Sequence, residues 1–303
     1  MKKILVTGGT GLVGSQFNGS EFLKIGSKDL NLLSQLEVQN FFKDHDIEGV
    51  IHCAARVGGI LGNMTKQAEF FYENAFMNTV LIEEARKANV KKFVSFLSTC
   101  VFPDDVEYPL TVDKIHKGKP HSSNYGYAYA KRMADIQLQT YQEQYGLSYF
   151  SVIPSNIYGP NDFYNLNDGH VIPSLIHKMY IAQRENKDMI IWGSGNPLRE
   201  FIFSKDVANL TTMLYNDYQD NSPVILSSDE EISIKELVGI LAELFNFKGN
   251  IKFDDSKPDG QFRKPSDNTK IKDLYPNYTF TNIYNGLKES VDWFRQNYES
   301  ARK

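Results

Sequence analysis

Short hydrophobic runs alternate with longer amphipathic stretches over the first half of the chain. Four of the runs are almost continuously apolar: 2–8, 49–55, 91–98 and 148–155. Such runs are typical of strands that are buried on both faces of a parallel sheet. The stretches 69–89 and 127–145 place apolar residues at helical spacing, and Gly146 follows the second stretch as a helix stop. Strands and helices in this order predict an α/β fold with a doubly wound parallel sheet.

The pattern changes after Pro160. We expect further helices at 171–184, 233–247 and 283–300, short strands at 189–193 and 223–228, and a loop at 254–267. We therefore expect two lobes. The larger lobe comprises residues 1–160 plus about 200–228, and the smaller, C-terminal lobe comprises about 161–199 plus 229–303. The smaller lobe is expected to close over the carboxyl edge of the sheet, where ligands bind in such folds.

Composition narrows the class of protein. The chain has 303 residues and a formal net charge of -4, and its Lys and Arg residues are scattered, so we expect no nucleic-acid partner. No apolar run approaches the length of a membrane span, and the start MKKILVTGG does not resemble a signal peptide. The two cysteines, Cys53 and Cys100, show no metal-ligand spacing, so we expect no metal site. Cys53 is interpreted as a small buried residue of a cytoplasmic protein.

A glycine-rich turn follows the first predicted strand. In TGGTGLVG, residues 7–14, the residues Gly8, Gly11 and Gly14 allow a tight turn, a close approach to a pyrophosphate and close packing of a helix on a strand. This context predicts a dinucleotide-binding loop in the larger lobe. The segment up to the next strand is short, so the first helix is expected to be clipped.

The next strand after the glycine loop ends near IGSKD, residues 25–29, and this end indicates which dinucleotide binds. An acidic residue here usually grips the ribose hydroxyls of NAD, but this chain presents Ser27 and Lys28 before Asp29. A cation and a hydroxyl suit the 2′-phosphate of NADP, so Lys28 predicts NADP(H). Alternatively, Lys28 is merely solvated.

GYAYAKRM places Tyr127 and Lys131 four residues apart, on one face of a predicted helix. A nearby ammonium and the positive nicotinamide ring favour the phenolate and are expected to lower the pKa of Tyr127, so that this residue exchanges a proton with a carbonyl oxygen. Ser98, at the end of a predicted strand, is expected to bond the same oxygen. Together with the glycine loop, these residues predict a reductase.

The chain resembles the extended short-chain dehydrogenases/reductases and, among them, the GDP-L-fucose synthase family. The resemblance spans nearly the whole chain and rests on these stretches: TGGTGLVGS, AARVGGI, LSTCVFP, GYAYAKRM, VIPSNIYGPND, DGHVIPSLIHK, WGSGNPLREFIFS and KPDGQFRK. It implies NADPH-dependent reduction of the 4-keto group of a GDP-4-keto-6-deoxy sugar, with epimerisation at C-3 and C-5. The chain departs from the family at its clipped first helix and at Val112, where many relatives carry an acidic residue.

The resemblance gives a role to two further residues. Taken alone, Cys100 would be a structural thiol and His170 a loop histidine. In the family, the matching cysteine and histidine transfer protons during epimerisation. The resemblance therefore implies that Cys100 and His170 join Ser98, Tyr127 and Lys131 as catalytic residues.

The resemblance also implies contacts with the ligands. Beyond Gly8, Gly11, Gly14, Lys28, Tyr127 and Lys131, the implied cofactor contacts are Leu12, Val13, Ala54, Leu97, Pro154, Asn156, Ile157 and His170. The implied substrate contacts are Lys178, Trp192, Arg199 and Asp259. Arg199 suits a diphosphate because a guanidinium binds phosphate bidentately, although it could equally form a surface salt bridge, and Trp192 could equally be a core residue.

Three functional readings stay open at this point. The first is the epimerase/reductase. The second is a 4-reductase for a related GDP-4-keto sugar, such as a GDP-6-deoxy-heptose, acting after a separate epimerase. The third is an NADP-binding sensor or scaffold without turnover. The resemblance further implies a homodimer formed through the two long helices at 69–89 and 127–145.

Overall fold

A parallel sheet forms the centre of the larger lobe. The computed structural model describes residues 2–228, 230–257, 259 and 261–303, apart from the side chains of residues 60 and 61. In this part of the chain, six strands lie in the order β2-β1-β3-β4-β5-β9, and every neighbouring pair is parallel. The strands are β1 (Lys3–Thr7), β2 (Phe22–Ile25), β3 (Ile47–His52), β4 (Lys92–Phe96), β5 (Ser148–Pro154) and β9 (Val224–Leu226). The predicted parallel sheet is confirmed.

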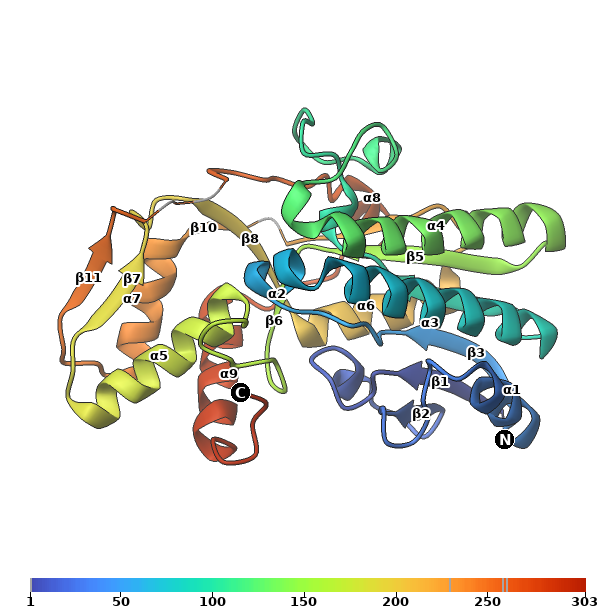
Figure 1. The fold of residues 1–303 in the computed structure, drawn as a ribbon, viewed down its shortest axis with the longest axis horizontal. Helices are drawn as coiled ribbons and strands as arrows, with labels where there is room; N and C mark the ends of the chain where they lie inside the picture. The colour runs from blue at the N-terminus through green and yellow to red at the C-terminus, as the bar shows by residue number, and fades with distance from the viewer. Residues whose placement is uncertain (1, 229, 258, 260) are drawn as a thin grey trace.

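Helices cover both faces of this sheet, as Figure 1 shows. Leu5 of β1 points into a core shared with α1 (Gln35–Asp44), α3 (Gln67–Lys87) and α4 (Tyr125–Tyr145). Its neighbours Ile4 and Val6 point to the other face, where they share a core with α6 (Ser204–Asp217) and α8 (Thr269–Leu274). Residues that alternate between two buried faces explain why the strands read as continuous apolar runs.

The helix boundaries follow local chain chemistry. Gly146 adopts a left-handed conformation with φ of 63° at the end of α4, as expected of a glycine helix stop. The clipped first helix is confirmed, because a single 3₁₀ turn, η1 (Gly14–Gln16), follows the glycine loop. Other short elements lie in the loops of this lobe: α2 (Ile60–Thr65), η2 (Thr99–Val101), η3 (Val112–Lys114) and η4 (Ser122–Asn124).

The second lobe has its own core. The helices α5 (Val171–Glu185), α7 (Ile234–Phe245) and α9 (Ile283–Gln296) pack together there. A small sheet is formed by β10 (Glu231–Ser233), β8 (Leu198–Phe203) and β6 (Asn156–Tyr158), and β7 (Met189–Trp192) pairs with β11 (Ile251–Asp254). Of these strands only β7 is predicted from sequence, and α9 ends four residues before the expected Ser300.

We propose that the chain divides into the two lobes expected from the sequence. Two parts of that division need a different place. The strand β6 and the 200–203 end of β8 belong to the small sheet, so they join the second lobe. Ile271, on α8, lies within the core of the larger lobe, and Tyr275 and Tyr278 pack against the same core. Residues of about 269–280 therefore pack with the larger lobe, although the division expected from the sequence placed them in the smaller one.

A buried chain of polar groups ties the strand ends to a helix. Thr7 Oγ1 lies 2.7 Å from His52 Nδ1, and His52 Nε2 lies 2.9 Å from the side-chain oxygen of Asn78 on α3. The backbone N–H of Ala54 also donates to Thr7 Oγ1, at 3.3 Å. Burial and, to a smaller extent, the nearby Lys131 ammonium lower the pKa of His52 to about 3. His52 is therefore neutral in the folded protein and protonates only on unfolding near neutral pH.

We expect His52 to make the protein acid-sensitive. Its folded pKa lies below that of an unfolded histidine, so its contribution to stability is complete above about pH 6.5 and is lost as pH falls towards about 3. His52→Gln should remove this loss, which amounts to at most about 1.4 kcal/mol per pH unit. Urea unfolding at pH 7.5 and pH 5.5 measures the effect. Equal acid sensitivity in both proteins would contradict the assignment of a neutral, buried His52.

Candidate active site

The loops that follow the parallel strands converge at the carboxyl edge of the sheet. Strand order reverses between β1 and β3, which is where dinucleotides bind in doubly wound folds. Gly8 has a φ of 67°, and a Cβ at this position would lie 2.9 Å from the backbone N of Ala54. A Cβ on Gly14 would collide with the carbonyl of Gly8. The glycine loop is thus as tight as a pyrophosphate cradle requires, which fits a bound dinucleotide.

The other residues predicted to contact the cofactor lie in the glycine loop or near the ends of later strands. Val13 is buried, and Leu12 is partly buried, in the core that the sheet shares with α6 and α8. Ala54, Leu97 and Pro154 follow or end β3, β4 and β5. Asn156 and Ile157 open β6, and the Asn156 side chain donates to the carbonyl of Glu200 at 2.8 Å. The structure brings these positions to one edge, and their contacts with a cofactor stay a prediction.

The turn after β2 presents a cation at the same edge. Asp29 accepts a hydrogen bond from the N–H of Gly26 at 2.7 Å, so its carboxylate is used within the turn. A Cβ on Gly26 would lie 3.1 Å from the hydroxyl oxygen of Thr10, so this turn packs against the glycine loop. Lys28, in the same turn, is exposed. The arrangement fits the 2′-phosphate of NADP better than the ribose hydroxyls of NAD.

Tyr127 and Lys131 lie one turn apart on α4, and the Lys131 ammonium is 5.8 Å from the centroid of the Tyr127 ring. Lys131 is 1% exposed, and its ammonium donates to the carbonyl of Phe96 at 2.7 Å. Ser98 follows Phe96 by two residues, so β4 and α4 bring all three predicted reductase residues together. The bond to Phe96 uses one of three N–H donors of Lys131, and the others fit cofactor hydroxyls.

One electrostatic expectation is wrong. We expected Lys131 to lower the pKa of Tyr127, but burial raises this pKa, and negative charge on Cys100 would raise it further. Burial also lowers the pKa of Lys131, to about 8, although negative charge on Cys53 acts in the opposite direction. Tyr127 is therefore a protonated phenol in this structure, which suits a proton donor.

Cys100 lies in the 3₁₀ turn η2, directly beside the reductase residues. The hydroxyl of Ser98 accepts a hydrogen bond from the backbone N–H of Cys100 at 3.3 Å, so Ser98 caps the turn that carries the thiol. Burial raises the pKa of the other thiol, Cys53, which packs against the core as interpreted from sequence. Both thiols are free.

His170 approaches from the second lobe. It is exposed and stands immediately before α5, at the N-cap position. The preceding loop packs against the loop after β3, because a Cβ on Gly59 would lie 2.7 Å from the carbonyl oxygen of Asp168. This packing brings the His170 loop to the edge of the sheet that carries the other predicted catalytic residues.

Two predicted substrate residues form an aromatic and cationic surface on the second lobe. Trp192 is 70% exposed, so the alternative reading of a core tryptophan is wrong. The ammonium groups of Lys178 and Lys257 each lie 5.8 Å from its ring centroid. An exposed indole flanked by cations suits a planar base joined to phosphates.

The other two predicted substrate residues lie close by. Asp259 accepts hydrogen bonds from the backbone N–H and the hydroxyl of Ser194, at 2.6 and 2.7 Å, and so holds the turn that follows Trp192. The Arg199 guanidinium donates to the carbonyls of Leu198 and Phe262, at 2.7 and 3.4 Å. Burial lowers the pKa of Arg199. A partly buried guanidinium bonded to carbonyls favours a ligand-binding role over a surface salt bridge.

Lys264 is a site residue that sequence reasoning missed. Its ammonium donates to the carbonyl of Thr99 at 3.0 Å, directly before Cys100. Burial lowers the pKa of Lys264, and negative charge on Cys100 opposes this effect. Lys264 reaches Cys100 only because of the path that the 254–267 loop takes. The motif KPDGQFRK marked that loop as part of the family pattern, but it did not indicate this contact.

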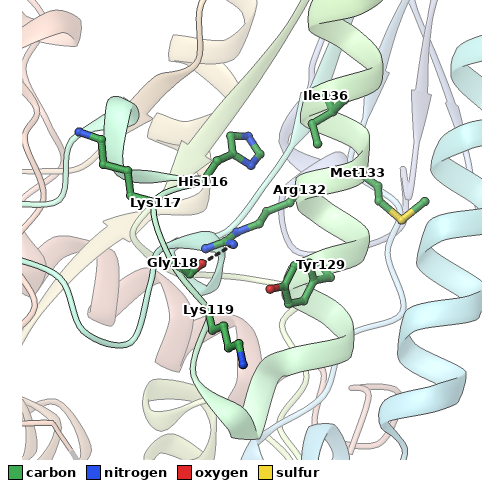
Figure 2. A pocket seen from close by; sticks show the side chains of 8 residues that line it. All are labelled: His116, Lys117, Gly118, Lys119, Tyr129, Arg132, Met133 and Ile136. Carbon is green, nitrogen blue, oxygen red and sulfur yellow. Dashed lines mark hydrogen bonds between the residues drawn. The ribbon is translucent and has the colours of Figure 1, made fainter.

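A pocket of about 440 Å³ lies apart from the predicted site, on the outer side of α4. Figure 2 shows the Arg132 guanidinium inside it, donating to the carbonyl of Gly118 at 2.6 Å. Arg132 also donates to the carbonyl of Val101 at 2.7 Å, so it braces the turn that carries Cys100 from behind. None of the predicted site residues lines this pocket.

Within the described residues, no helix has the length and apolarity needed to span a membrane. The same residues contain no group of three or more His, Cys, Asp or Glu side chains arranged to hold a metal ion.

Comparison with known proteins identifies the family. The model of the NAD dependent epimerase/dehydratase family matches residues 4–226. The chain belongs to this family. A curated GDP-L-fucose synthase from Dictyostelium discoideum is 46% identical over all of this chain and 98% of its own length. The chain therefore also belongs with the GDP-L-fucose synthases.

Solved structures agree with this placement. A GDP-L-fucose synthetase from Naegleria fowleri, bound to NADP, is 42% identical over all of this chain and 95% of its own, with a TM-score of 0.95. A GDP-mannoheptose C4 reductase from Campylobacter jejuni, with NADP bound, is 25% identical over 97% of this chain and 98% of its own, with a TM-score of 0.84. The fold is shared, and the sequence lies nearer the fucose synthases.

Lys28 provides a test of cofactor preference. Lys28→Ala should weaken NADPH binding by about tenfold, or about 1.4 kcal/mol, because a phosphate contact is lost. NADH binding should change less than about twofold. Fluorescence titration of each cofactor measures both. Lys43→Ala, an exposed lysine on α1, is the control and should change neither. Equal weakening of NADPH and NADH by Lys28→Ala would show that Lys28 is only solvated.

Proposed function

We propose that this protein is a GDP-L-fucose synthase, which uses NADPH to convert GDP-4-keto-6-deoxymannose to GDP-L-fucose. The observation that carries the proposal is one cluster, in which Ser98 caps the turn of Cys100 while Tyr127 and Lys131 stand beside it on α4. The cluster supplies a phenol for reduction and a thiol for proton abstraction next to one carbonyl position. A sensor or scaffold without turnover has no need of this arrangement.

Reduction uses the phenol and the hydroxyl. NADPH, when bound, supplies the hydride that adds to C-4 of the sugar. Tyr127 gives its proton to the C-4 oxygen, and its raised pKa keeps that proton in place until charge develops on the oxygen. Ser98 donates to the same oxygen. Lys131 fixes the geometry of α4 against β4 and offers its other N–H groups to the cofactor.

Epimerisation uses the second pair. The 4-keto group acidifies the hydrogens on C-3 and C-5. Cys100, as thiolate, removes one of them, and the resulting enolate places its charge on the oxygen that Ser98 and Tyr127 bind. His170 then returns a proton to the opposite face of the carbon. Deprotonation on one face followed by protonation on the other inverts the centre.

The GDP portion is assigned to the second lobe. We infer that the guanine stacks on Trp192, with Lys178 and Lys257 close to the phosphates. Arg199 binds the diphosphate, which lies on the path from Trp192 to the catalytic cluster. Asp259 holds the turn between them. We also place the protein in the cytoplasm, in keeping with its two free thiols.

The alternative, a 4-reductase acting on a GDP-6-deoxy-heptose after a separate epimerase, has less support. Cys100 keeps its place beside the reductase residues, and Lys264 supplies a cation next to it. A protein that only reduces its substrate has no use for this second group.

Product analysis in D2O tests the proposal. Wild-type enzyme with GDP-4-keto-6-deoxymannose and NADPH should give GDP-L-fucose with deuterium at C-3 and C-5, as read by NMR. A product reduced at C-4 and free of deuterium at both carbons would establish a simple 4-reductase.

Two variants separate the half-reactions. Cys100→Ser should lower deuterium uptake by about 100-fold or more, because a hydroxyl is a far weaker acid than a thiol. Tyr127→Phe should lower hydride transfer by about 100-fold or more while NADPH still binds, because only the proton donor is lost. Near wild-type turnover by Tyr127→Phe would show that Tyr127 is not the proton donor.

We also propose a homodimer formed through α3 and α4. The two helices pack side by side on one face of the sheet (Figure 1). Both expose large apolar residues: Phe71 and Tyr72 on α3, and Tyr125, Met133, Ile136 and Tyr145 on α4. Exposed apolar residues that recur along adjacent helices are typical of a protein–protein interface.

Ile136→Lys tests this interface. The side chain is 51% exposed, so the new charge is tolerated by a monomer but would be buried in the dimer. At micromolar concentration, sedimentation should give the mass of two chains for the wild-type protein and the mass of one chain for Ile136→Lys. Ile190→Lys, at a 58% exposed isoleucine on β7, is the control and should stay a dimer. A monomeric wild-type protein would refute the proposal.

A further inference from the structure

Arg132 is a buried arginine that the reactions described above do not use. It follows Lys131 on α4 and is 5% exposed. Its guanidinium lies 5.3 Å from the centroid of the Tyr129 ring, and its Nη2 atom has no hydrogen-bond partner among the described residues. A buried guanidinium is costly to keep unless its N–H groups are bonded, so the bonds that Arg132 does form indicate its role.

These bonds go to two backbone carbonyls. The Nε–H group donates to the carbonyl of Val101 at 2.7 Å. A terminal N–H group donates to the carbonyl of Gly118 at 2.6 Å, and Figure 2 shows this second bond. Val101 is the last residue of η2, the turn that carries Cys100. One side chain on α4 therefore holds both the turn that carries the thiol and the loop that follows this turn.

The carbonyls on both sides of Cys100 are each bonded to a cationic side chain. Arg132 holds the carbonyl of Val101, which follows the thiol residue. Lys264 holds the carbonyl of Thr99, which precedes it, at 3.0 Å. Rotation of either neighbouring peptide group would break one of these bonds. The two cations therefore restrict the direction in which the Cys100 side chain leaves the backbone.

The strand end that precedes the turn has separate anchors. Phe96 pairs with Val152 inside the parallel sheet, and the Lys131 ammonium donates to the carbonyl of Phe96 at 2.7 Å. Ser98 follows Phe96 by two residues. Consecutive residues of α4 thus hold different parts of one segment. Lys131 holds the strand end before Ser98, whereas Arg132 holds the turn of the thiol.

We propose that Arg132 is a positioning residue for epimerisation, which holds the Cys100 turn so that the thiol faces the sugar carbons, and that hydride transfer does not depend on it. This inference rests on the proposed function. Proton abstraction requires the sulfur within reach of the hydrogen on carbon, so a turn that can shift lowers the rate. Hydride transfer uses Tyr127 and Ser98, which the bond from Lys131 to β4 holds together.

A different reading assigns Arg132 to the following loop alone. The bond to Gly118 would then be the important one, and its loss would loosen that loop. His116 offers the matched control, because its imidazole lies 3.0 Å from the Asp135 carboxylate and ties the same loop to α4 without a bond to the turn of the thiol. His116 is exposed, so we expect His116→Ala to fold as the wild type does.

The experiment compares two reactions in the same enzymes. Incorporation of deuterium from D2O into GDP-4-keto-6-deoxymannose reports epimerisation, and oxidation of GDP-L-fucose by NADP+ reports hydride transfer at C-4. Arg132→Ala should slow deuterium exchange by about 10- to 100-fold and oxidation by less than about threefold, because only the thiol is misplaced. His116→Ala should change either rate by less than about threefold.

Chemical rescue separates positioning from a general loss of structure. Arg132→Ala leaves space beside the pocket on the outer side of α4, so added guanidinium ion can enter and bond the two carbonyls. Millimolar guanidinium should raise exchange by about fivefold or more in this variant. Tetramethylammonium at the same concentration should not, because it has no N–H donor.

Arg132→Lys decides the question if Arg132→Ala is too unstable to purify. It keeps the charge and one hydrogen bond but loses the forked geometry of the guanidinium. We expect it to slow exchange by about 3- to 10-fold and to change oxidation by less than about twofold.

The outcomes separate the inference from the function on which it rests. If the Arg132 variants slow both reactions equally, or slow neither, the inference is overturned and the function stands. If His116→Ala slows exchange as much as Arg132→Ala does, or if guanidinium does not raise exchange in Arg132→Ala, the inference fails as well. If the wild type oxidises GDP-L-fucose but shows no exchange, the proposed function itself is wrong.

Discussion

The site depends on one buried ammonium. Lys131 is 1% exposed, and burying such a group is costly unless it is bonded. The carbonyl of Phe96, at the end of β4, accepts its hydrogen bond at 2.7 Å and so ties α4 to the carboxyl edge of the sheet. Tyr127 lies one helical turn before Lys131, and Ser98 lies two residues after Phe96. This bond between helix and strand therefore helps to set the spacing of the three residues predicted to carry out reduction.

The same charge organises its surroundings. The Lys131 ammonium helps to keep His52 neutral, and neutral His52 bridges Thr7 on β1 to Asn78 on α3. The Asn78 side chain in turn lies 3.5 Å from the carbonyl of Ala130, next to Lys131. The network closes on itself across two strands and two helices. Its polar groups are buried and hydrogen-bonded to one another. They lie next to the place where strand order reverses and the glycine loop begins.

The sequence predicts the large features of this molecule for identifiable reasons. Strands buried on both faces must be apolar throughout, so β1, β3, β4 and β5 were visible as runs. Tyr127 and Lys131 were visible because both lie within one helix at a fixed spacing. The strands β6 and β10 were missed because three residues leave little pattern. The strand β8 was missed because Arg199 and Glu200 interrupt its apolar run. Lys264 was missed because its role depends on where a long loop returns, which no local pattern encodes.

A cation from a distant part of the chain lies beside the thiol assigned to epimerisation. The Lys264 ammonium donates to the carbonyl of Thr99 at 3.0 Å, directly before Cys100. The turn that carries the thiol is also capped by Ser98, so the local chain and the returning loop hold it together. The phenol assigned to reduction depends mainly on its burial, which raises the pKa of Tyr127 and keeps the proton in place. One pocket can thus hold a thiol next to a cation and a neutral phenol, because a loop brings the cation to the thiol while desolvation keeps the phenol protonated.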